Sequence, residues 1–503
     1  MLKWANKNPG YILILLIAIS FFYANGLKII DYPPRSIHQW RQSDCLAYAK
    51  NYYQKGDGFF LPSTYNLAGN DGRVVSEFPI IYYLSGKLFK FFGVHYFILR
   101  GLTFMCFLLG LYYVYRSIKL FMQPSLAVIY PVLILASTPF YYYYALNYLP
   151  NVPALSFSFA GVYYLLSYAR TQKYTELIYA TLFLLLATAL KPTDGGILWA
   201  AYLGVAFFQV LQRKISLKVF LGNLACAAIV IAGIYWWYRF GVGYNNWNGN
   251  HQNLQSIYPI WDMSKKDVDW VWQNRILDFW ATAYQQRLVL YLLVVFVVIY
   301  LVRLPKLNPT LRLLTFISFL GTIGYDILWY KAFSDHDYYQ MVNVIPCLLL
   351  MITVLEWYSN NILPRLNKYT QSGITCVLLG LGMISVHHNR NMQRERYTKP
   401  EFQYANPDIY DAEPFLRKLG IRPNDAIVSV PDPSPNITLA AYGTQGYTES
   451  FNDDHFNITY FKTAGAKYLI INDSTYIHKP LYAPYTTKLL GKFRGNLFVY
   501  DLR

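Results

Sequence analysis

The sequence predicts an α-helical membrane protein that crosses the membrane many times and carries a soluble α/β domain at its C-terminal end. Its 503 residues are 55% hydrophobic and only 14% charged, compared with roughly 25% charged residues in a soluble domain. Apolar segments of about 17 to 22 residues recur, each long enough to cross a hydrocarbon core of roughly 30 Å as a helix. After His388 the composition changes to that of a soluble domain.

The first apolar segment, residues 11 to 30, predicts a retained membrane span. It is too long for the apolar part of a signal peptide and lacks a cleavage site of small residues. Lys3 and Lys7 precede it. Because positively charged residues favour the cytoplasmic side, we expect the N-terminus to lie in the cytoplasm.

The first loop on the outer side, residues 31 to 96, predicts two helices that lie along the membrane interface. The segment HQWRQSDCLAYAKNYYQKG has helical periodicity, and FPIIYYLSGKLFKFFG is amphipathic and rich in aromatic residues. Between them the sequence NLAGNDG is typical of turns.

Further apolar segments follow, with Lys and Arg gathered at alternate ends, as expected for spans that run back and forth. The total is about eleven spans, so the domain after the last span lies outside. We therefore divide the chain into a transmembrane domain, residues 1–390, and an outer domain, residues 391–503. The later spans are expected at 97–115, 125–144, up to Arg170, 175–190, up to Arg213, 218–238, up to Arg303, before KAFSDHDYYQ, up to Arg365, and up to HHNR.

The outer domain predicts a small α/β unit. DAIVSVPD and KYLIINDS are typical of buried strands, and they alternate with the helical segments DAEPFLRKLG and FNDDHFNITYFKTAG. VPDPSPNITL has two interpretations, a structural connection from strand to helix or a binding site for sugar or peptide.

Charge and cysteine content exclude several function classes. The net charge of +17 would suggest nucleic acid in a soluble protein, but the basic residues lie in the short connections between spans, so no nucleic-acid partner is expected. Four of the five cysteines lie within apolar segments and Cys45 stands alone. This spacing predicts neither a disulfide framework nor a zinc finger.

Polar residues of both charge signs gather at the outer ends of the predicted spans. Ionisable groups at a membrane boundary cost free energy unless they are paired or hydrated, so this one-sided cluster predicts a polar cavity that opens outward. Its members are Arg41, Asp44, Glu77, Asn151, Lys191, Asp194, Arg239, Arg287, Asp335, His336, Asp337 and Tyr339.

Each member also has a purely structural interpretation. Arg41 and Asp44 could form an ion pair on a hydrated helix face. Glu77 could cap the helix begun by the proline two residues later. Lys191 could extend to the interface from a turn between two helices, and residues 335–337 could be an ordinary exposed loop.

The combined chemistry suits a substrate with an anionic head and an apolar tail, such as a polyprenyl phosphate that carries a sugar. Cations would hold the phosphate and stabilise the charge that grows on it as the glycosidic bond breaks. A phosphate leaves without protonation. One carboxylate is therefore enough, as the base that deprotonates the acceptor hydroxyl.

At HQWRQSD, EFP and LKPTD the sequence resembles the GT-C superfamily of integral-membrane glycosyltransferases. It is similar to the bacterial branch related to protein O-mannosyltransferases and aminoarabinose lipid A transferases. Further similarities are AKNYYQKGD, KLFKFFG and the LPN turn after the third span. The likeness covers the first two hundred residues best, and the later spans resemble the family only in layout.

The resemblance implies a GT-C fold and inverting transfer of a sugar from a polyprenyl-phosphate donor to an envelope acceptor on the outer face of the membrane. It implies Asp44 as base, although relatives often have an acidic pair where this chain has Arg41 and Gln42. Glu77 would orient substrate or base. Asn151 stands where relatives carry Asp, so an ionic role there is in doubt. The residues assigned to the donor phosphate are Arg41, Lys191, Arg287, His336 and Tyr339.

Two other functions remain open at this point. A flippase would move the lipid-linked sugar without chemistry, although transporters usually carry charges near the midplane and inverted repeats. An envelope-assembly scaffold would act through its outer domain. No cofactor is predicted, and a divalent metal is left open because no ligand spacing identifies one. The resemblance and the topology together indicate a bacterial inner membrane, and an archaeal or organellar membrane stays open as an alternative. The acceptor could be protein, lipid or glycan.

Overall fold

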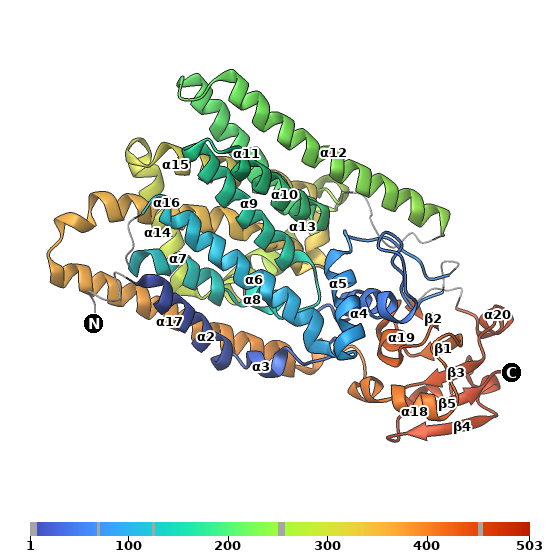
Figure 1. Cartoon of the computed structure of the whole chain (residues 1–503). Coiled ribbons are helices and arrows are strands. Elements are labelled where there is room, and N and C mark those ends of the chain that lie inside the picture. Colours follow the sequence, from blue (N-terminus) through green and yellow to red (C-terminus); the bar gives the residue numbers. More distant parts are fainter. Residues whose placement is uncertain (1–7, 68–70, 123–125, 250–256, 451–455) are drawn as a thin grey trace. The chain divides into compact units, whose positions relative to one another are not determined.

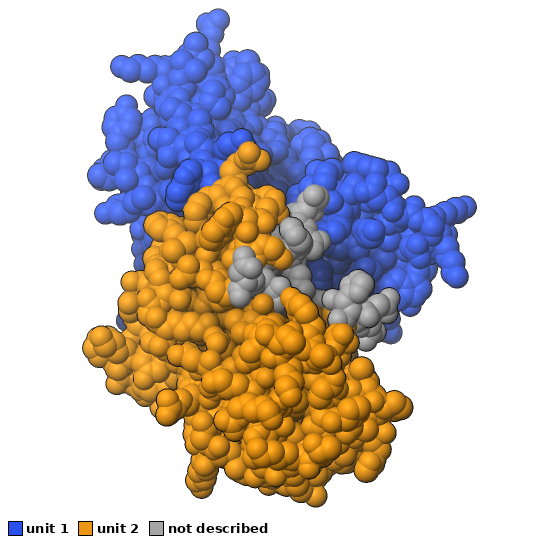
Figure 2. All heavy atoms as spheres, turned by 90° about the vertical axis from the view of Figure 1, so that its right-hand side faces the viewer, with its two compact units in different colours: residues 1–29, 103–237, 256–395 blue, residues 30–102, 238–255, 396–503 orange. Residues whose placement is uncertain are grey.

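The computed structural model describes residues 8–67, 71–122, 126–249, 257–450 and 456–503. By internal contacts the chain forms two compact units, coloured separately in Figure 2. Unit 1 contains residues 1–29, 103–237 and 256–395, and unit 2 contains residues 30–102, 238–255 and 396–503. The predicted division of the chain at residue 390 stays a prediction.

The apolar segments form long helices, and in the described part of the chain eight of these are long and apolar enough to cross a membrane. This confirms the predicted fold class of a helical polytopic membrane protein. The eight contain α6 (Tyr96–Lys119), α9 (Asn151–Thr171), α11 (Pro192–Leu211), α12 (Leu217–Trp247), α14 (Arg287–Arg303), α15 (Pro309–Leu328), α16 (Val344–Asn361) and α17 (Lys368–Thr398).

The other three predicted spans are shorter or interrupted. The first forms α2 (Pro9–Tyr23) followed by α3 (Gly26–Ile29), and the fifth forms α10 (Tyr174–Leu190). The third is divided into α7 (Leu126–Ser137) and α8 (Pro139–Ala145). The break lies before Pro139 because the residue preceding a proline disfavours the helical backbone, and Thr138 is extended there.

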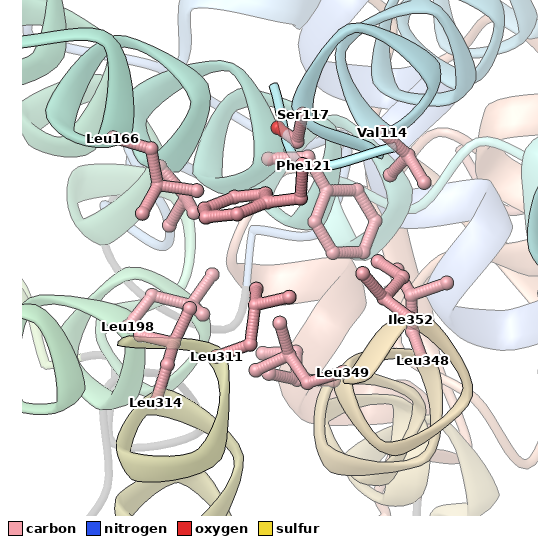
Figure 3. Close-up of a pocket in the computed structure, with 13 residues that line it drawn as sticks. Val114, Ser117, Phe121, Leu166, Leu198, Leu311, Leu314, Leu348, Leu349 and Ile352 are labelled. Carbon is pink, nitrogen blue, oxygen red and sulfur yellow. The ribbon is translucent and has the colours of Figure 1, made fainter. Parts of the chain in front are cut away.

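Within unit 1 the helices pack against one another in succession. Helix α9 packs against α10 and α11, α11 against α15, and α15 against α16 (Figure 1). Side chains of α6, α9, α11, α15 and α16 line a small apolar cavity, including Val114, Leu198 and Leu311 (Figure 3). The cavity wall carries no ionisable group, so the candidate chemistry lies elsewhere.

The C-terminal sequence folds into a five-stranded mixed sheet with the order β2-β1-β3-β5-β4. The central strands β1 and β3 are parallel, with Ile427 opposite Tyr468, and β5 runs antiparallel to both β3 and β4. Both strands predicted from the sequence are confirmed as β1 and β3. The strands are β1 (Ile427–Val430), β2 (Gly446–Thr448), β3 (Tyr468–Ile471), β4 (Leu489–Phe493) and β5 (Leu497–Asp501).

Helices cover both faces of this sheet, which explains why every residue of its central strands β1 and β3 is buried. Alternate residues of a strand point to opposite faces, so Ile427 and Val428 belong to different apolar clusters. Two helices were predicted here, and both are present among the described residues; the first five residues of the second predicted segment, 451–455, lie outside them. The helices of this part are α18 (Glu413–Lys418), α19 (Ile437–Tyr442) and α20 (Ile458–Thr463).

The first loop also packs against one face of the sheet. Its segments form the two predicted helices, α4 (Gln39–Gln54) and α5 (Ile80–Phe92), and these pack against each other. Their placement along the membrane interface stays a prediction. Ala47 of α4 and Tyr65 belong to the same buried cluster as Ile427 and Leu439. Helix α4 is therefore part of the core of unit 2 and is buried on nearly all sides.

Candidate active site

The first group of predicted residues lies on α4 and just before α5. Arg41, Asp44 and Glu77 are 7%, 9% and 6% exposed. The helix places Arg41 and Asp44 on one face because residues three apart are neighbours on a helix. Helix α5 begins at Ile80 with Pro79 as its N-cap, so Glu77 lies two residues before the cap and does not hold the capping position considered from the sequence. The fold thus brings all three ionisable groups together inside unit 2.

Arg41 joins the two carboxylates. Its Nη2 donates to Glu77 Oε2 and, over 3.1 Å, to Ser76 Oγ, which itself donates to Glu77. Its Nη1 lies 3.8 Å from Asp44 Oδ2. The ion pair of Arg41 and Asp44 considered from the sequence is therefore present. Both side chains are buried, so the interpretation that placed this pair on a hydrated helix face is wrong.

Arg41 keeps one donor available. Among the described residues, its buried Nη1 has no hydrogen-bond partner. Burial alone would lower its pKa, but the charge of Glu77 holds the pKa of Arg41 above its ordinary value. A permanently charged guanidinium with an unused N–H beside a carboxylate can bind an anionic oxygen.

Asp44 has the protonation behaviour of a base for neutral pH. Burial raises the pKa of its carboxyl to about 7, while Arg41 and the Asn436 side chain lower it and Glu77 raises it. A general base works best when its pKa lies near the operating pH. A carboxyl of this kind can take a proton from a hydroxyl at neutral pH.

Arg100, which the sequence interpretation did not single out, closes the same region of unit 2. It is fully buried and donates to the carbonyl oxygens of Tyr32 at 2.9 Å and Pro33 at 3.0 Å, and to Gln42. It fixes the segment that leads into α4. Its position inside an apolar span was the signal that could have found it, because a buried arginine requires partners.

The second group of predicted residues lies in unit 1 around Lys191. Lys191 has an extended backbone between α10 and α11, so it occupies the predicted turn. Its Nζ lies 5.9 Å and 5.8 Å from the ring centres of Tyr338 and Tyr339. These tyrosines belong to the 3-10 helix η6 (Asp337–Asn343). A cation within about 6 Å of an aromatic ring centre is attracted by the negative face of the ring.

The neighbours of Lys191 are themselves fixed. His336 stacks on Tyr338 at 5.3 Å between ring centres, the Tyr325 hydroxyl donates to the Tyr339 carbonyl at 3.0 Å, and the Tyr144 hydroxyl donates to Asp337. The segment 335–337 is thus more than an exposed loop, although Asp335 itself is exposed.

Three other predicted residues take different positions. Arg287 is exposed at the first position of α14. Arg239 lies within α12, which continues to Trp247, beyond the predicted end of that span at residue 238. Asn151 and Asp194 are buried at the starts of α9 and α11, and each keeps one side-chain oxygen without a hydrogen-bond partner in the described part of the chain.

Within the described ranges, no three His, Cys, Asp or Glu side chains gather in a way that could hold a metal ion. The five cysteines are free thiols. The structure thus brings the predicted residues into two groups, one in each unit, and their assignment to a single reaction stays a prediction.

Comparison with solved structures identifies the fold. ArnT from Cupriavidus metallidurans in the apo state matches with a TM-score of 0.61 and 13% identity, covering 98% of each chain. The same protein bound to undecaprenyl phosphate matches at 0.58 and 12%, again over 98% of each chain. This chain has the GT-C fold. The archaeal oligosaccharyltransferase AglB from Archaeoglobus fulgidus, in complex with an inhibitory peptide and a dolichol-phosphate, matches at 0.52 and 9%, over 92% of this chain and 69% of AglB.

The GT-C likeness also appears in sequence. Residues 76–237 match the family model of dolichyl-phosphate-mannose-protein mannosyltransferases. No curated protein is similar enough in sequence to be matched. The matched segment begins one residue before Glu77 and includes Lys191 and Asp194, whereas α4 with Arg41 and Asp44 precedes it. The resemblance to the GT-C superfamily stated from the sequence is confirmed at the level of the fold.

Proposed function

We propose that this GT-C protein is a glycosyltransferase that moves a sugar from a polyprenyl-phosphate donor to an envelope acceptor on the outer face of the membrane. The observation that carries the proposal is the buried Asp44, with a pKa of about 7, beside an Arg41 guanidinium that has an unused N–H. The fold match to an ArnT bound to undecaprenyl phosphate supports the class of donor.

The reaction assigned to these groups is a single displacement with inversion. Asp44 accepts the proton of the acceptor hydroxyl, whose oxygen attacks the anomeric carbon of the sugar. The bond from that carbon to the phosphate oxygen breaks, and the polyprenyl phosphate leaves with one more negative charge. Stabilising such growing charge with fixed cations is usually the largest catalytic contribution.

Each cation has a role that follows from its surroundings. Arg41 directs a donor to the reacting oxygens beside Asp44, and Glu77 holds the other side of its guanidinium. Lys191, fixed over Tyr338 and Tyr339, is assigned to the donor phosphate, together with His336. Arg287 is kept as an outer contact for the same anion. We assign the active side to the periplasm of a bacterial inner membrane, with the N-terminus in the cytoplasm.

The proposal is tested by the release of free lipid phosphate. The purified protein in nanodiscs is given undecaprenyl-phosphate hexose or pentose, each with a labelled sugar, and membranes from a strain that lacks the gene as acceptor. We expect labelled sugar on an acceptor and an equal amount of free undecaprenyl phosphate. A flippase or a scaffold would release none, so intact donor with every sugar and acceptor tested would overturn the proposal.

Lys191→Met is expected to lower kcat/KM for transfer roughly 10- to 100-fold, because a hydrogen bond or contact between charged groups contributes about 1.5 to 3 kcal/mol. Lys173→Met is the matched control, since Lys173 is exposed at the other end of α10. Kinetics at saturating acceptor provide the measurement. Equal rates for both variants would remove Lys191 from the proposed site.

A further inference from the structure

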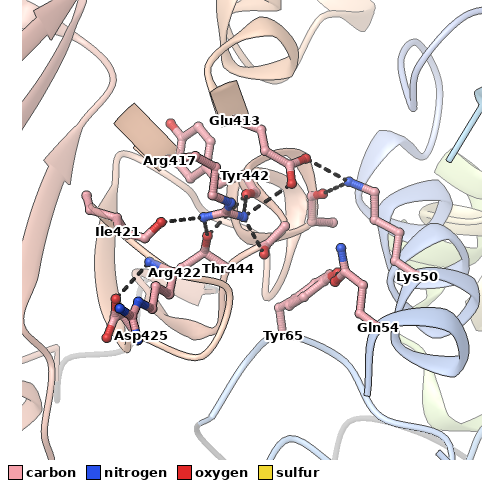
Figure 4. Close-up of polar contacts among 12 residues, drawn as sticks. Lys50, Gln54, Tyr65, Glu413, Arg417, Ile421, Arg422, Asp425, Tyr442 and Thr444 are labelled. Atoms are coloured by element: carbon pink, nitrogen blue, oxygen red, sulfur yellow. Dashed lines mark hydrogen bonds and ion pairs between the residues drawn. The ribbon is translucent and has the colours of Figure 1, made fainter. Parts of the chain in front are cut away.

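The C-terminal part of the chain is fastened to α4 by a buried lysine. Lys50 is 3% exposed, and its Nζ donates to the carbonyl oxygen of Ala440 on α19 at 3.0 Å (Figure 4). The same Nζ lies 3.6 Å from Glu413, which also pairs with Arg417. These bonds hold α19 alongside α4, the helix that carries Asp44.

The connection that leads into α19, residues 431–436, is braced from within. Asp432 accepts hydrogen bonds from the backbone N–H and the hydroxyl of both Ser434 and Thr438, at 2.6 to 2.9 Å. Asn66 of the first loop donates to the Pro435 carbonyl at 2.7 Å. A segment held by this many bonds presents the following side chain, that of Asn436, in a fixed direction.

Asn436 ends this segment beside Asp44. Its side chain is fully buried, it lies close enough to act on the Asp44 carboxyl, and no described residue is an aligned hydrogen-bond partner of its amide. Although Asn436 is the N-cap residue of α19, its side chain makes no capping bond. The ordinary structural role of an asparagine at this position is therefore not the one it performs.

The groups around Asp44 indicate what the Asn436 side chain can do there. The charged and titratable groups that face Asp44 are Arg41, Cys45 and Tyr48 from α4, Glu77 before α5, and Asp432 from the C-terminal connection. Arg41 Nη1 lies 3.8 Å from Asp44 Oδ2, which is beyond hydrogen-bond distance. A second donor would fix the direction of the carboxylate, and Asn436 is the neutral donor beside it.

We infer that Asn436 is a positioning residue of the active site, whose side-chain N–H donates to the Asp44 carboxylate and orients it toward the acceptor hydroxyl. The inference rests on the proposed role of Asp44 as base. It assigns the C-terminal domain a part in catalysis, because that domain then completes the surroundings of a base carried by the first loop.

The sign of the effect follows from the protonation states. A hydrogen bond to a carboxylate favours the charged form, so Asn436 lowers the pKa of Asp44 against the opposing effect of burial. Without the amide, the pKa of Asp44 rises. Because the base must be deprotonated, the acidic limb of the pH profile of kcat/KM then moves to higher pH.

The test compares Asn436→Ala with wild type and with Asn424→Ala, a control at an exposed asparagine of the same domain. We expect the acidic limb to rise by about one pH unit in Asn436→Ala, which lowers kcat/KM about fivefold at pH 7 and very little at pH 9. Asn436→Asp, which keeps the shape and adds a charge, should move the limb further upward. The control should follow wild type.

A second measurement does not depend on activity. Difference infrared titration follows the Asp44 carboxyl, identified as the band that is lost in Asp44→Asn, and its midpoint should rise by the same amount in Asn436→Ala. If the midpoint and the limb both stay in place, the inference about Asn436 is overturned while the proposed function stands. If wild type transfers no sugar but the midpoint shifts, the proposed function fails and the link between Asn436 and Asp44 stands.

Discussion

Asp44→Asn is expected to lower sugar transfer by at least about 10³-fold, because the substitution removes the proton acceptor and leaves the shape of the side chain almost unchanged. Release of undecaprenyl phosphate from a labelled donor, measured in nanodiscs, gives the rate. Binding of the donor should change far less than turnover, since the group removed acts on the acceptor. Asp31→Asn is the matched control, as Asp31 is exposed and precedes α4.

The same substitution should stabilise the protein at alkaline pH, which separates loss of the base from loss of the fold. In the folded protein the pKa of Asp44 is raised from an ordinary 3.8 to about 7, so the folded state binds this proton more tightly than the unfolded state. The cost of ionising Asp44 is therefore absent below about pH 4 and complete above about pH 7, where it reaches up to about 4 kcal/mol. Asparagine does not ionise.

Thermal unfolding in nanodiscs at several pH values measures this difference. The advantage of Asp44→Asn over wild type should grow from pH 5 to pH 8, while Asp31→Asn shows no such trend. A variant that folds, binds donor and transfers sugar at the wild-type rate would move the base elsewhere, to Glu77 first.

Much of the fold could be predicted because the membrane leaves few solutions. A segment of about 20 apolar residues has to be a helix in the hydrocarbon core, so the segments that become α6, α9 and α16 were readable one at a time. The break at Thr138 was not predicted, although the following Pro139 is a local signal for it. Helices α12 and α17 extend beyond their apolar parts, where hydropathy no longer marks the end of a helix.

The C-terminal sheet was predicted only in its central strands. Strands β1 and β3 are fully buried and largely apolar, whereas β4 is half exposed and pairs with β5 across a turn at Arg494 and Gly495. In a hairpin of this kind apolar and polar residues alternate and charged residues occur, so its sequence differs less from that of the surrounding loops. The packing of α4 into the core of this domain depends on contacts between Ala47 and residues almost 400 positions away, which no local pattern records.

Several residues of the candidate site were predicted one by one, but not their full arrangement. Arg41, Asp44 and Glu77 were found because charges beside a membrane span are rare, and the helical spacing placed two of them together. Asn436 was missed as a site residue because a Pro- and Asn-rich connection is ordinary in a soluble domain. The role that we infer for it rests on the three-dimensional proximity of α19 to α4, which the Lys50 bond to Ala440 supports.

Arg41→Met is expected to destabilise the protein by about 3 to 5 kcal/mol at pH 8, the usual cost of removing one partner from a buried ion pair. The guanidinium pairs with the buried Glu77 carboxylate and lies beside the buried Asp44 carboxylate, and methionine replaces its methylene stem at similar volume. Removing it takes this positive charge away from both carboxylates. The shift in the thermal unfolding midpoint in nanodiscs, converted with the unfolding enthalpy, gives the loss.

Two comparisons show that the loss comes from uncompensated charge and not from altered packing. Arg73→Met removes an exposed arginine from the same loop, where the pair with Asp71 contributes at most about 1 kcal/mol. Arg41→Met combined with Glu77→Gln should recover most of the loss, because one of the two stranded carboxylates becomes neutral. At pH 5 the single variant should also be less impaired, since Arg41 lowers the pKa of Asp44 and its removal lets that carboxyl take up a proton more readily. A loss that is equal at both pH values, or that the double variant retains in full, would mean that Arg41 stabilises unit 2 by packing alone.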